Sequence, residues 1–85
     1  MPTSTVVVGS AVGLHARPAA IIASAVNDLG EEVTLAMPGG DPVDASSALL
    51  IMTLGAAKGD SVEVSSPSEP AHAAIAALVA QDLDV

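Results

Sequence analysis

Four short stretches of the chain have the apolar pattern of β-strands. The β-branched run from Thr5 to Val8 predicts the first strand, which the two residues before it are able to extend. Apolar and polar residues alternate from Glu32 to Met37 and again from Ser61 to Ser65, as in strands buried on one face. The turn-forming sequence PGGDP at 38–42 leads into a short strand around Val43, which is expected to pair back.

Two stretches have the spacing of helices. From Ala16 to about Leu29 apolar residues recur every three or four positions, and Gly30 follows as a helix-ending glycine. A shorter apolar helix is expected from Ala48 to Leu54, after several candidate N-caps at 44–47 and before Gly55. The residues expected to face the core from the first helix are Ala19, Ile22, Val26 and Leu29.

A third helix is expected near the end of the chain. Ser66 or Ser68 would cap it, with Pro67 or Pro70 in its first turn. His72 lies among alanines of this helix and is expected to face solvent. The residues expected to face the core are Ala71, Ile75, Leu78 and Val79.

The predicted element order is strand, helix, strand, strand, helix, strand, helix. Because the strands alternate apolar and polar residues, one sheet face is expected to be solvated and the other covered by helices. We therefore expect an α+β two-layer sandwich with a mainly antiparallel sheet, formed by residues 1–85 as one domain. The element order equally allows a ferredoxin-like arrangement.

Composition limits the class of protein. Phe, Trp, Tyr and Cys are absent, so aliphatic residues and Met must build the core, and disulfide or thiol chemistry is excluded. The apolar stretch ALLIMTLGAA is about half the roughly 20 residues that a membrane-spanning helix requires, and the N-terminus lacks the basic region of a secretory signal. We expect a cytoplasmic protein without membrane insertion, and a monomer by default.

Charge is unevenly distributed along the chain. Ten acidic residues against two basic ones give a net charge of −8, which argues against binding to nucleic acid or anionic membranes. The first 27 residues contain no Asp or Glu. Two interpretations stay open: chance in an apolar segment, or a site near Arg17 that must accept an anion.

The sequence GLHARPAA at 13–20 has the features of such an anion site. A helix that starts at Ala16 leaves its first backbone N–H groups without intrahelical partners, at the positive end of the helix dipole and beside His15. Pro18 in the first turn loses only an N–H that would be unpaired. Arg17 is able to hold phosphate oxygens through two parallel hydrogen bonds. Ala16, Arg17 and Pro18 are therefore the predicted phosphate-binding residues.

The same geometry bears on the imidazole of His15. A positive charge there would oppose the helix dipole, so the ring is expected to be neutral, with a lone pair available for nucleophilic attack. No carboxylate lies nearby in the sequence to activate water, so a phosphoryl group on this ring is expected to last long enough to be passed on.

GLHARPAA resembles the phosphorylation-site signature of the HPr family, the histidine-containing phosphocarriers of the sugar phosphotransferase system. The resemblance spans nearly the whole chain, because ASSALLIMTLGAAKGD stands where that family has its second helix and following turn. It implies an HPr-like open-faced sandwich with sheet order 1-4-2-3 and three helices on one face.

The resemblance also implies roles for individual residues. His15 would accept a phosphoryl group at Nδ1 from phosphorylated enzyme I, itself charged by phosphoenolpyruvate, and donate it to the IIA domains of sugar permeases, with Arg17 as electrostatic partner. The protein would be a carrier rather than an enzyme and would need no cofactor.

Ser47 matches the regulatory serine that a dedicated kinase phosphorylates in some HPr proteins. A phosphate there would place negative charge near the docking surface. The alternative is that Ser46 or Ser47 only caps the second helix. The sequence departs from the kinase-regulated pattern, since Ala48 stands where a larger apolar residue is usual.

Docking to partners is expected to depend on apolar contacts. Many HPr proteins have several lysines around the histidine, whereas this chain has only Arg17 and Lys58. Ala48, Leu49 and Met52 are the candidate apolar docking residues, because a short helix cannot bury every face. The alternative is that Leu49 and Met52 belong to the core.

The sequence gives little support for a metal site or a nucleotide-binding loop. His72 has no partner histidine at a metal-ligand spacing, so no metal is expected, and PGGD lacks the lysine and hydroxyl pattern of a P-loop. The alternative function is a regulatory or binding module of the same fold, or a carrier in a nitrogen-related phosphorelay. An autonomous histidine phosphotransferase or hydrolase is disfavoured because no nucleotide site or general base is evident.

Overall fold

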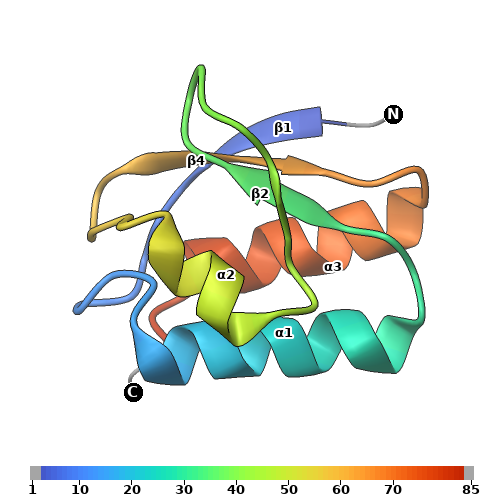
Figure 1. The fold of residues 1–85 in the computed structure, drawn as a ribbon, viewed down its shortest axis with the longest axis horizontal. Coiled ribbons are helices and arrows are strands. Elements are labelled where there is room, and N and C mark those ends of the chain that lie inside the picture. The colour runs from blue at the N-terminus through green and yellow to red at the C-terminus, as the bar shows by residue number, and fades with distance from the viewer. Residues whose placement is uncertain (1–2, 84–85) are drawn as a thin grey trace.

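The computed structural model describes residues 3–83, which form a four-stranded antiparallel sheet in the order β1-β4-β2-β3 with three helices (Figure 1). The strands are β1 (Thr3–Val7), β2 (Thr34–Ala36), β3 (Val43–Asp44) and β4 (Ser61–Ser65). The helices are α1 (Ala16–Leu29), α2 (Ala48–Thr53) and α3 (Glu69–Ala80). This confirms the predicted α+β sandwich and the 1-4-2-3 order, and it excludes the ferredoxin-like alternative.

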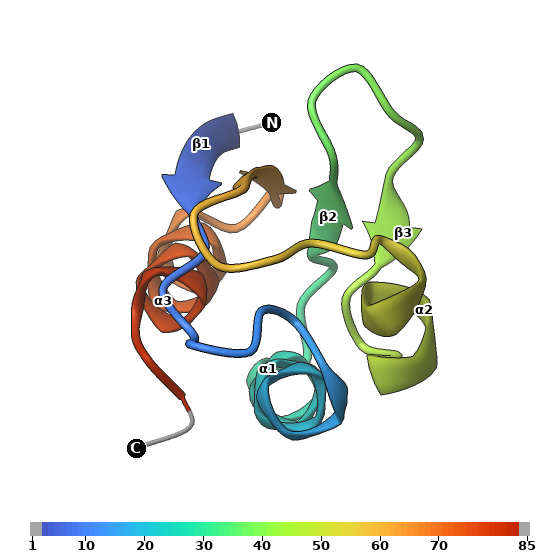
Figure 2. The same ribbon diagram turned by 90° about the vertical axis from the view of Figure 1, so that its left-hand side faces the viewer.

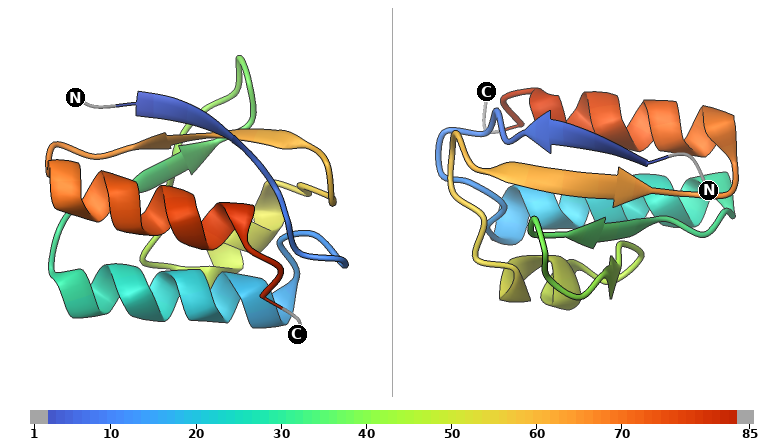
Figure 3. Two further views of the ribbon diagram at one scale, coloured as in Figure 1. Left: turned by 180° about the vertical axis from the view of Figure 1, so that it is seen from behind. Right: turned by 90° about the horizontal axis from the view of Figure 1, so that it is seen from above.

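The molecule has two layers. The helices lie on one face of the sheet, with α1 and α3 side by side and the short α2 beside α1 (Figures 2 and 3). The alternation of β4 explains this arrangement: Val62 and Val64 are fully buried, whereas the residues that alternate with them, Ser61, Glu63 and Ser65, are only partly covered. No helix among residues 3–83 has the length and apolar character needed to cross a bilayer.

The core joins the buried face of the sheet to one stripe of each long helix. It is built without aromatic side chains, from aliphatic residues and alanine, as the composition requires. Close packing of such side chains drives the association of the two layers. The largest fully buried members are Ile22 and Val26 of α1, Leu35 of β2, Ile51 of α2, Val62 and Val64 of β4, Ile75 and Val79 of α3, and Val8 and Val33 just outside the strands.

Several expected boundaries and side-chain positions are corrected. β1 ends at Val7, and Val8 is buried just after it, where its N–H donates to the Asp60 carbonyl (2.9 Å). β2 is shorter than predicted. Leu29 is 41% exposed rather than part of the buried stripe; it is the last residue of α1.

The expectation that His72 faces solvent is also wrong. Its side chain is only 13% exposed, and Nε2 lies 2.9 Å from the hydroxyl oxygen of Ser4 on β1. Its Nδ1 lies 3.6 Å from Glu69. The reason is tertiary: α3 packs against β1, so this side of an alanine-rich helix is covered.

Candidate functional site

The start of α1 is the centre of the candidate site, and His15 is its N-cap residue. His15 has an extended backbone (φ −81°, ψ −167°), and its carbonyl accepts the first helical hydrogen bond, from the Ala19 N–H (2.9 Å). Its side chain makes no capping hydrogen bond and is exposed. The predicted helix start is therefore confirmed, with the imidazole outside the helix and accessible.

The first turn of α1 presents free donors beside this imidazole. Among residues 3–83, the N–H groups of Ala16 and Arg17 donate to no protein acceptor, as the geometry of a helix start dictates. Pro18, the third residue of the helix, is buried and has no N–H. The first turn contains no acidic residue, so nothing in it opposes a bound anion.

Arg17 is exposed on the same turn and forms no salt bridge with any described residue. Its guanidinium is therefore not engaged by a carboxylate of the described chain. A planar guanidinium near a helix start suits the recognition of phosphate oxygens.

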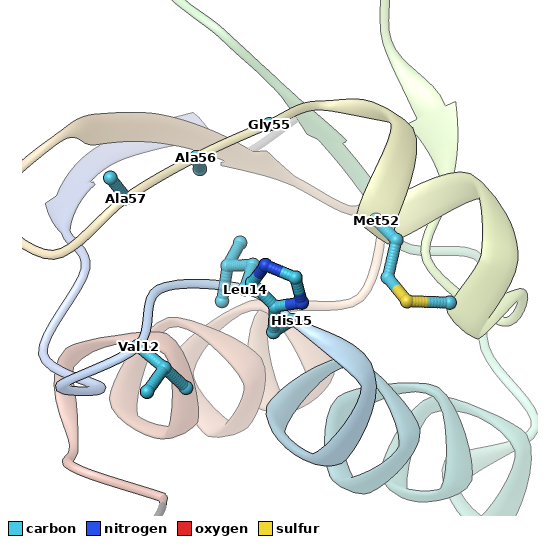
Figure 4. Close-up of a pocket in the computed structure, with 7 residues that line it drawn as sticks. All are labelled: Val12, Leu14, His15, Met52, Gly55, Ala56 and Ala57. Atoms are coloured by element: carbon cyan, nitrogen blue, oxygen red, sulfur yellow. The ribbon is translucent and has the colours of Figure 1, made fainter.

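A pocket of about 230 Å³ opens beside the imidazole (Figure 4). In Figure 4 the His15 ring lies between Met52 of α2 and the segment 55–57 that follows it. Arg17 is not among its lining residues, so the predicted pair of functional side chains flanks the helix start without sharing one pocket. The lining residues are Val12, Leu14, His15, Met52, Gly55, Ala56 and Ala57.

Backbone contact between two distant segments holds His15 at this pocket. The Leu14 N–H donates to the Ala56 carbonyl (2.9 Å). Gly13 has φ +74°, and a Cβ there would lie 2.4 Å from the Ala56 oxygen and 2.8 Å from the Ala57 Cα. Only glycine allows this approach, both for its left-handed conformation and for the space available.

The start of α2 is built differently. The Ser47 hydroxyl caps it by accepting a hydrogen bond from the Leu50 N–H (3.2 Å). Ser46 is held by the Asp44 carboxylate, which accepts bonds from its N–H (2.9 Å) and its hydroxyl (2.7 Å). These bonds hold the pKa of Asp44 below its ordinary value of 3.8. The N-cap role of Ser47 is present in the structure.

The three candidate docking residues differ in exposure. Leu49 is 70% exposed, which excludes the alternative that it belongs to the core. Ala48 and Met52 are half-buried and pack against the core, and Met52 also lines the pocket. The fully buried residue of α2 is Ile51.

Sequence reasoning missed the wall of the pocket. Val12, 56% exposed, and the backbone of 55–57 carry no chemical signal and lie about 40 residues apart in the chain. The sequence left open whether C-terminal acids approach the site. Asp82 accepts a bond from the Ala11 N–H (3.4 Å), whereas Asp84 lies outside the described residues.

Comparison of the sequence with known proteins finds phosphocarrier proteins. The profile of the family described as "PTS HPr component phosphorylation site" matches residues 2–81. The chain is 45% identical over 80 residues to a phosphocarrier protein HPr of Streptomyces coelicolor, covering 91% of this chain and 86% of that protein. It is 32% identical over 76 residues to the phosphocarrier protein NPr of Escherichia coli, covering 89% and 84%.

Solved structures agree with the sequence comparisons. A crystal structure of a phosphocarrier protein HPr from Bacillus anthracis superposes with a TM-score of 0.84 at 30% identity, covering 92% of this chain and 95% of that one. A crystal structure of HPr from Thermoanaerobacter tengcongensis gives a TM-score of 0.83 at 29% identity, covering 93% and 91%.

Proposed function

The chain belongs to the HPr family of phosphocarrier proteins, and on that premise we propose that His15 accepts a phosphoryl group from phosphorylated enzyme I and passes it to sugar-specific IIA domains for carbohydrate uptake. Proteins of this family carry the group and are not enzymes. The observation that carries the proposal is the placement of His15: an exposed imidazole at the N-cap of α1, beside unpaired backbone donors.

The transfer step needs little from the protein beyond position and charge. The lone pair of the imidazole Nδ1 attacks phosphorus as the bond between phosphorus and the donor breaks, and the proton on the other ring nitrogen stays in place. Negative charge on the equatorial oxygens is stabilised by the N–H groups of Ala16 and Arg17, the helix dipole and the Arg17 guanidinium. Pro18 fixes the backbone of the turn without donating.

Leu49, with Ala48 and Met52 beside it on α2, is proposed to contact the partner proteins. Leu49 is 70% exposed on the helix that also lines the pocket through Met52, so a partner bound there would reach His15. The chain has few basic residues, and long-range attraction to acidic surfaces therefore contributes little.

Ser47 is proposed as a second modification site, for a serine kinase. Its hydroxyl stands at the N-cap of α2, one residue before the docking residues. A phosphate there would be favoured by the helix dipole and would add negative charge next to Leu49, weakening the contact with partners. Cytoplasmic localisation belongs to the same proposal, because enzyme I takes the phosphoryl group from phosphoenolpyruvate, a metabolite of the cytoplasm.

The decisive experiment mixes the protein with phosphoenolpyruvate and enzyme I and measures incorporation of acid-labile phosphate. One phosphate per chain is expected, and none in His15→Ala. Arg17→Ala is expected to lower the transfer rate by roughly a hundredfold, the loss typical of a preorganised donor at a charged transition state. Full phosphate incorporation into His15→Ala would end the proposal.

Docking has its own test. Leu49→Ala is expected to raise the enzyme I half-saturation concentration, whereas Leu29→Ala, 41% exposed at the far end of α1, leaves it unchanged. Raising salt from 50 to 500 mM is expected to change that concentration by less than about threefold, since apolar contacts are not screened. A steep salt dependence would contradict apolar docking.

A nitrogen-related relay is the second candidate, favoured by the 32% identity to the Escherichia coli NPr. It uses the same His15 chemistry with different partners. Comparing phosphorylation rates with enzyme I of the sugar system and with its nitrogen-related counterpart separates the two functions.

A further inference from the structure

Ser10 is a fully buried polar residue in the loop 9–13 that precedes His15. Its hydroxyl donates to the Gln81 carbonyl (3.3 Å) and accepts from the Leu83 N–H (3.1 Å). A buried hydroxyl that lost such partners would be costly, so these two bonds fix the side chain in place.

The residues on either side of Ser10, Gly9 and Ala11, also form hydrogen bonds with residues near the end of α3. The Gly9 N–H donates to the Val79 carbonyl (3.1 Å), and a Cβ at Gly9 would lie 2.1 Å from the Ala80 oxygen. Three consecutive residues of the loop, 9, 10 and 11, therefore bond to residues 79–83. Figure 3 shows this loop beside the end of α3.

The other end of the loop is attached to the pocket wall. The Gly13 N–H donates to the Ser10 carbonyl (2.9 Å), which closes a turn, and the Leu14 N–H then donates to the Ala56 carbonyl. Ser10 is thus linked to His15 through one tight turn. A shift at its hydroxyl would move Gly13 and Leu14, and with them the imidazole relative to the first turn of α1.

We propose that Ser10 is a positioning residue for phosphoryl transfer at His15. Its buried hydroxyl ties the loop 9–13 to residues 81–83, so that the imidazole keeps its place relative to the donors of α1 and the segment 55–57. The proposal rests on the proposed function of His15. It assigns to residues 81–83 a role in the geometry of the site.

The molecule contains a matched control in Ser66, the other fully buried serine. Its hydroxyl likewise donates to a carbonyl, that of Glu32, and accepts from a backbone N–H, that of Ser68 (3.1 Å). It lies beyond the far end of α1, whose 14 residues span about 21 Å. Ser10→Ala and Ser66→Ala therefore remove similar pairs of bonds, near His15 and far from it.

The experiment measures single-turnover phosphorylation of both variants by phosphorylated enzyme I, together with their urea unfolding. Ser10→Ala is expected to lower the maximal transfer rate about tenfold, the scale of a small misplacement at a reacting centre, with the half-saturation concentration unchanged. Ser66→Ala, with a similar loss of stability, is expected to leave both values unchanged. Equal transfer rates in the two variants would overturn the proposal.

Amide hydrogen exchange gives a readout that does not depend on phosphorylation. The N–H groups of Gly13 and Leu14 are expected to exchange faster in Ser10→Ala than in Ser66→Ala; equal exchange would overturn the positioning role. If Ser10→Ala does not fold, Ser10→Cys, which keeps the volume and a weak donor, takes its place. If the wild type itself takes up no phosphate, the proposed function fails while the exchange comparison still decides whether Ser10 holds the loop.

Discussion

The starts of α1 and α3 are alike in backbone and opposite in chemistry. Both N-cap residues are extended, His15 at φ −81° and Ser68 at φ −94°. The Ser68 hydroxyl accepts a bond from the Ala71 N–H (3.4 Å), and Glu69 places an acid in the first turn of α3. His15 makes no such bond, and the first turn of α1 contains no acid.

The start of α3 is stabilised by protein groups, whereas the start of α1 has no side-chain cap and no acid in its first turn. Serine caps and first-turn acids satisfy the donors and the dipole of a helix from within the protein. At α1 those donors stay available beside an exposed imidazole, which is the arrangement that the proposed binding of a phosphoryl group requires. The start of α2, capped by Ser47, resembles that of α3.

Replacing His15 gives the largest expected effect. His15→Ser turns the start of α1 into a copy of the start of α3, and phosphorylation by enzyme I is expected to be lost completely. The serine should also make the variant more stable than His15→Ala by about 1 kcal/mol, the usual value of an N-cap. Phosphate incorporation and urea denaturation measure the two effects. Equal stability of the two variants would mean that this helix start does not accept a cap.

Gly13→Ala is expected to damage the approach to α1. An alanine at φ +74° costs about 1–2 kcal/mol by itself, and a Cβ at 2.4 Å from the Ala56 oxygen forces the two segments apart, for about 1–3 kcal/mol more. Gly39→Ala is the matched control, because Gly39 has φ +76° but a Cβ there would meet nothing within 4 Å.

Only the conformational cost is expected for Gly39→Ala, with an unchanged rate of phosphoryl transfer. Thermal and urea denaturation compare the two variants, and transfer kinetics report on the site. A Gly13→Ala variant as stable as Gly39→Ala would show that the contact with Ala56 yields without cost.

Ser68→Ala removes the N-cap hydrogen bond of α3, a kind of bond that α1 does not have. The expected loss in the free energy of unfolding is about 1 kcal/mol, with no change in the transfer rate, since the Ser68 side chain acts only on α3. Urea denaturation and enzyme I kinetics test the two halves of this prediction. A slower transfer rate in Ser68→Ala would contradict this prediction, because it would mean that the cap of α3 also affects the site at the start of α1.

The smallest expected effect is the pH dependence at Asp44, just before α2. Its folded pKa lies below 3.8, so its stabilisation is complete above about pH 5 and is lost as the pH falls below 3.8 through the folded pKa. In Asp44→Asn the free energy of unfolding should lose this part of its acid dependence. Urea denaturation between pH 2.5 and 6 measures the free energy of unfolding of the variant and of the wild type. If the difference between the two stays the same across this range, Asp44 does not contribute to the acid dependence.

Much of the fold follows from local pattern. The alternation of β4 and the apolar spacing of α1 predict which residues are buried, because a strand has a period of 2 and a helix one of 3.6. The same reasoning fails for Leu29 and His72, since their exposure depends on what lies opposite them. Leu29 at the end of α1 is 41% exposed, and His72 is covered by β1.

Some features of the candidate site also follow from local sequence, whereas others depend on distant segments. The position of His15 at a helix start, with Arg17 and Pro18 in the first turn, follows from eight consecutive residues. The pocket wall at 55–57 and the anchoring of Ser10 at residues 81–83 have no signature in the sequence. Contacts made by backbone atoms are available to every residue type, so composition and spacing do not reveal them.

The elements, their order and the chemistry at the start of α1 follow from local sequence, because helix starts, turns and buried faces are governed by residues close together in the chain. The way in which the loop before His15 is anchored depends instead on contacts between distant segments. The packing of Gly13 on Ala56 and of Ser10 on the end of α3 joins segments about 40 and 70 residues apart. Such contacts form only when the whole core brings their backbones together.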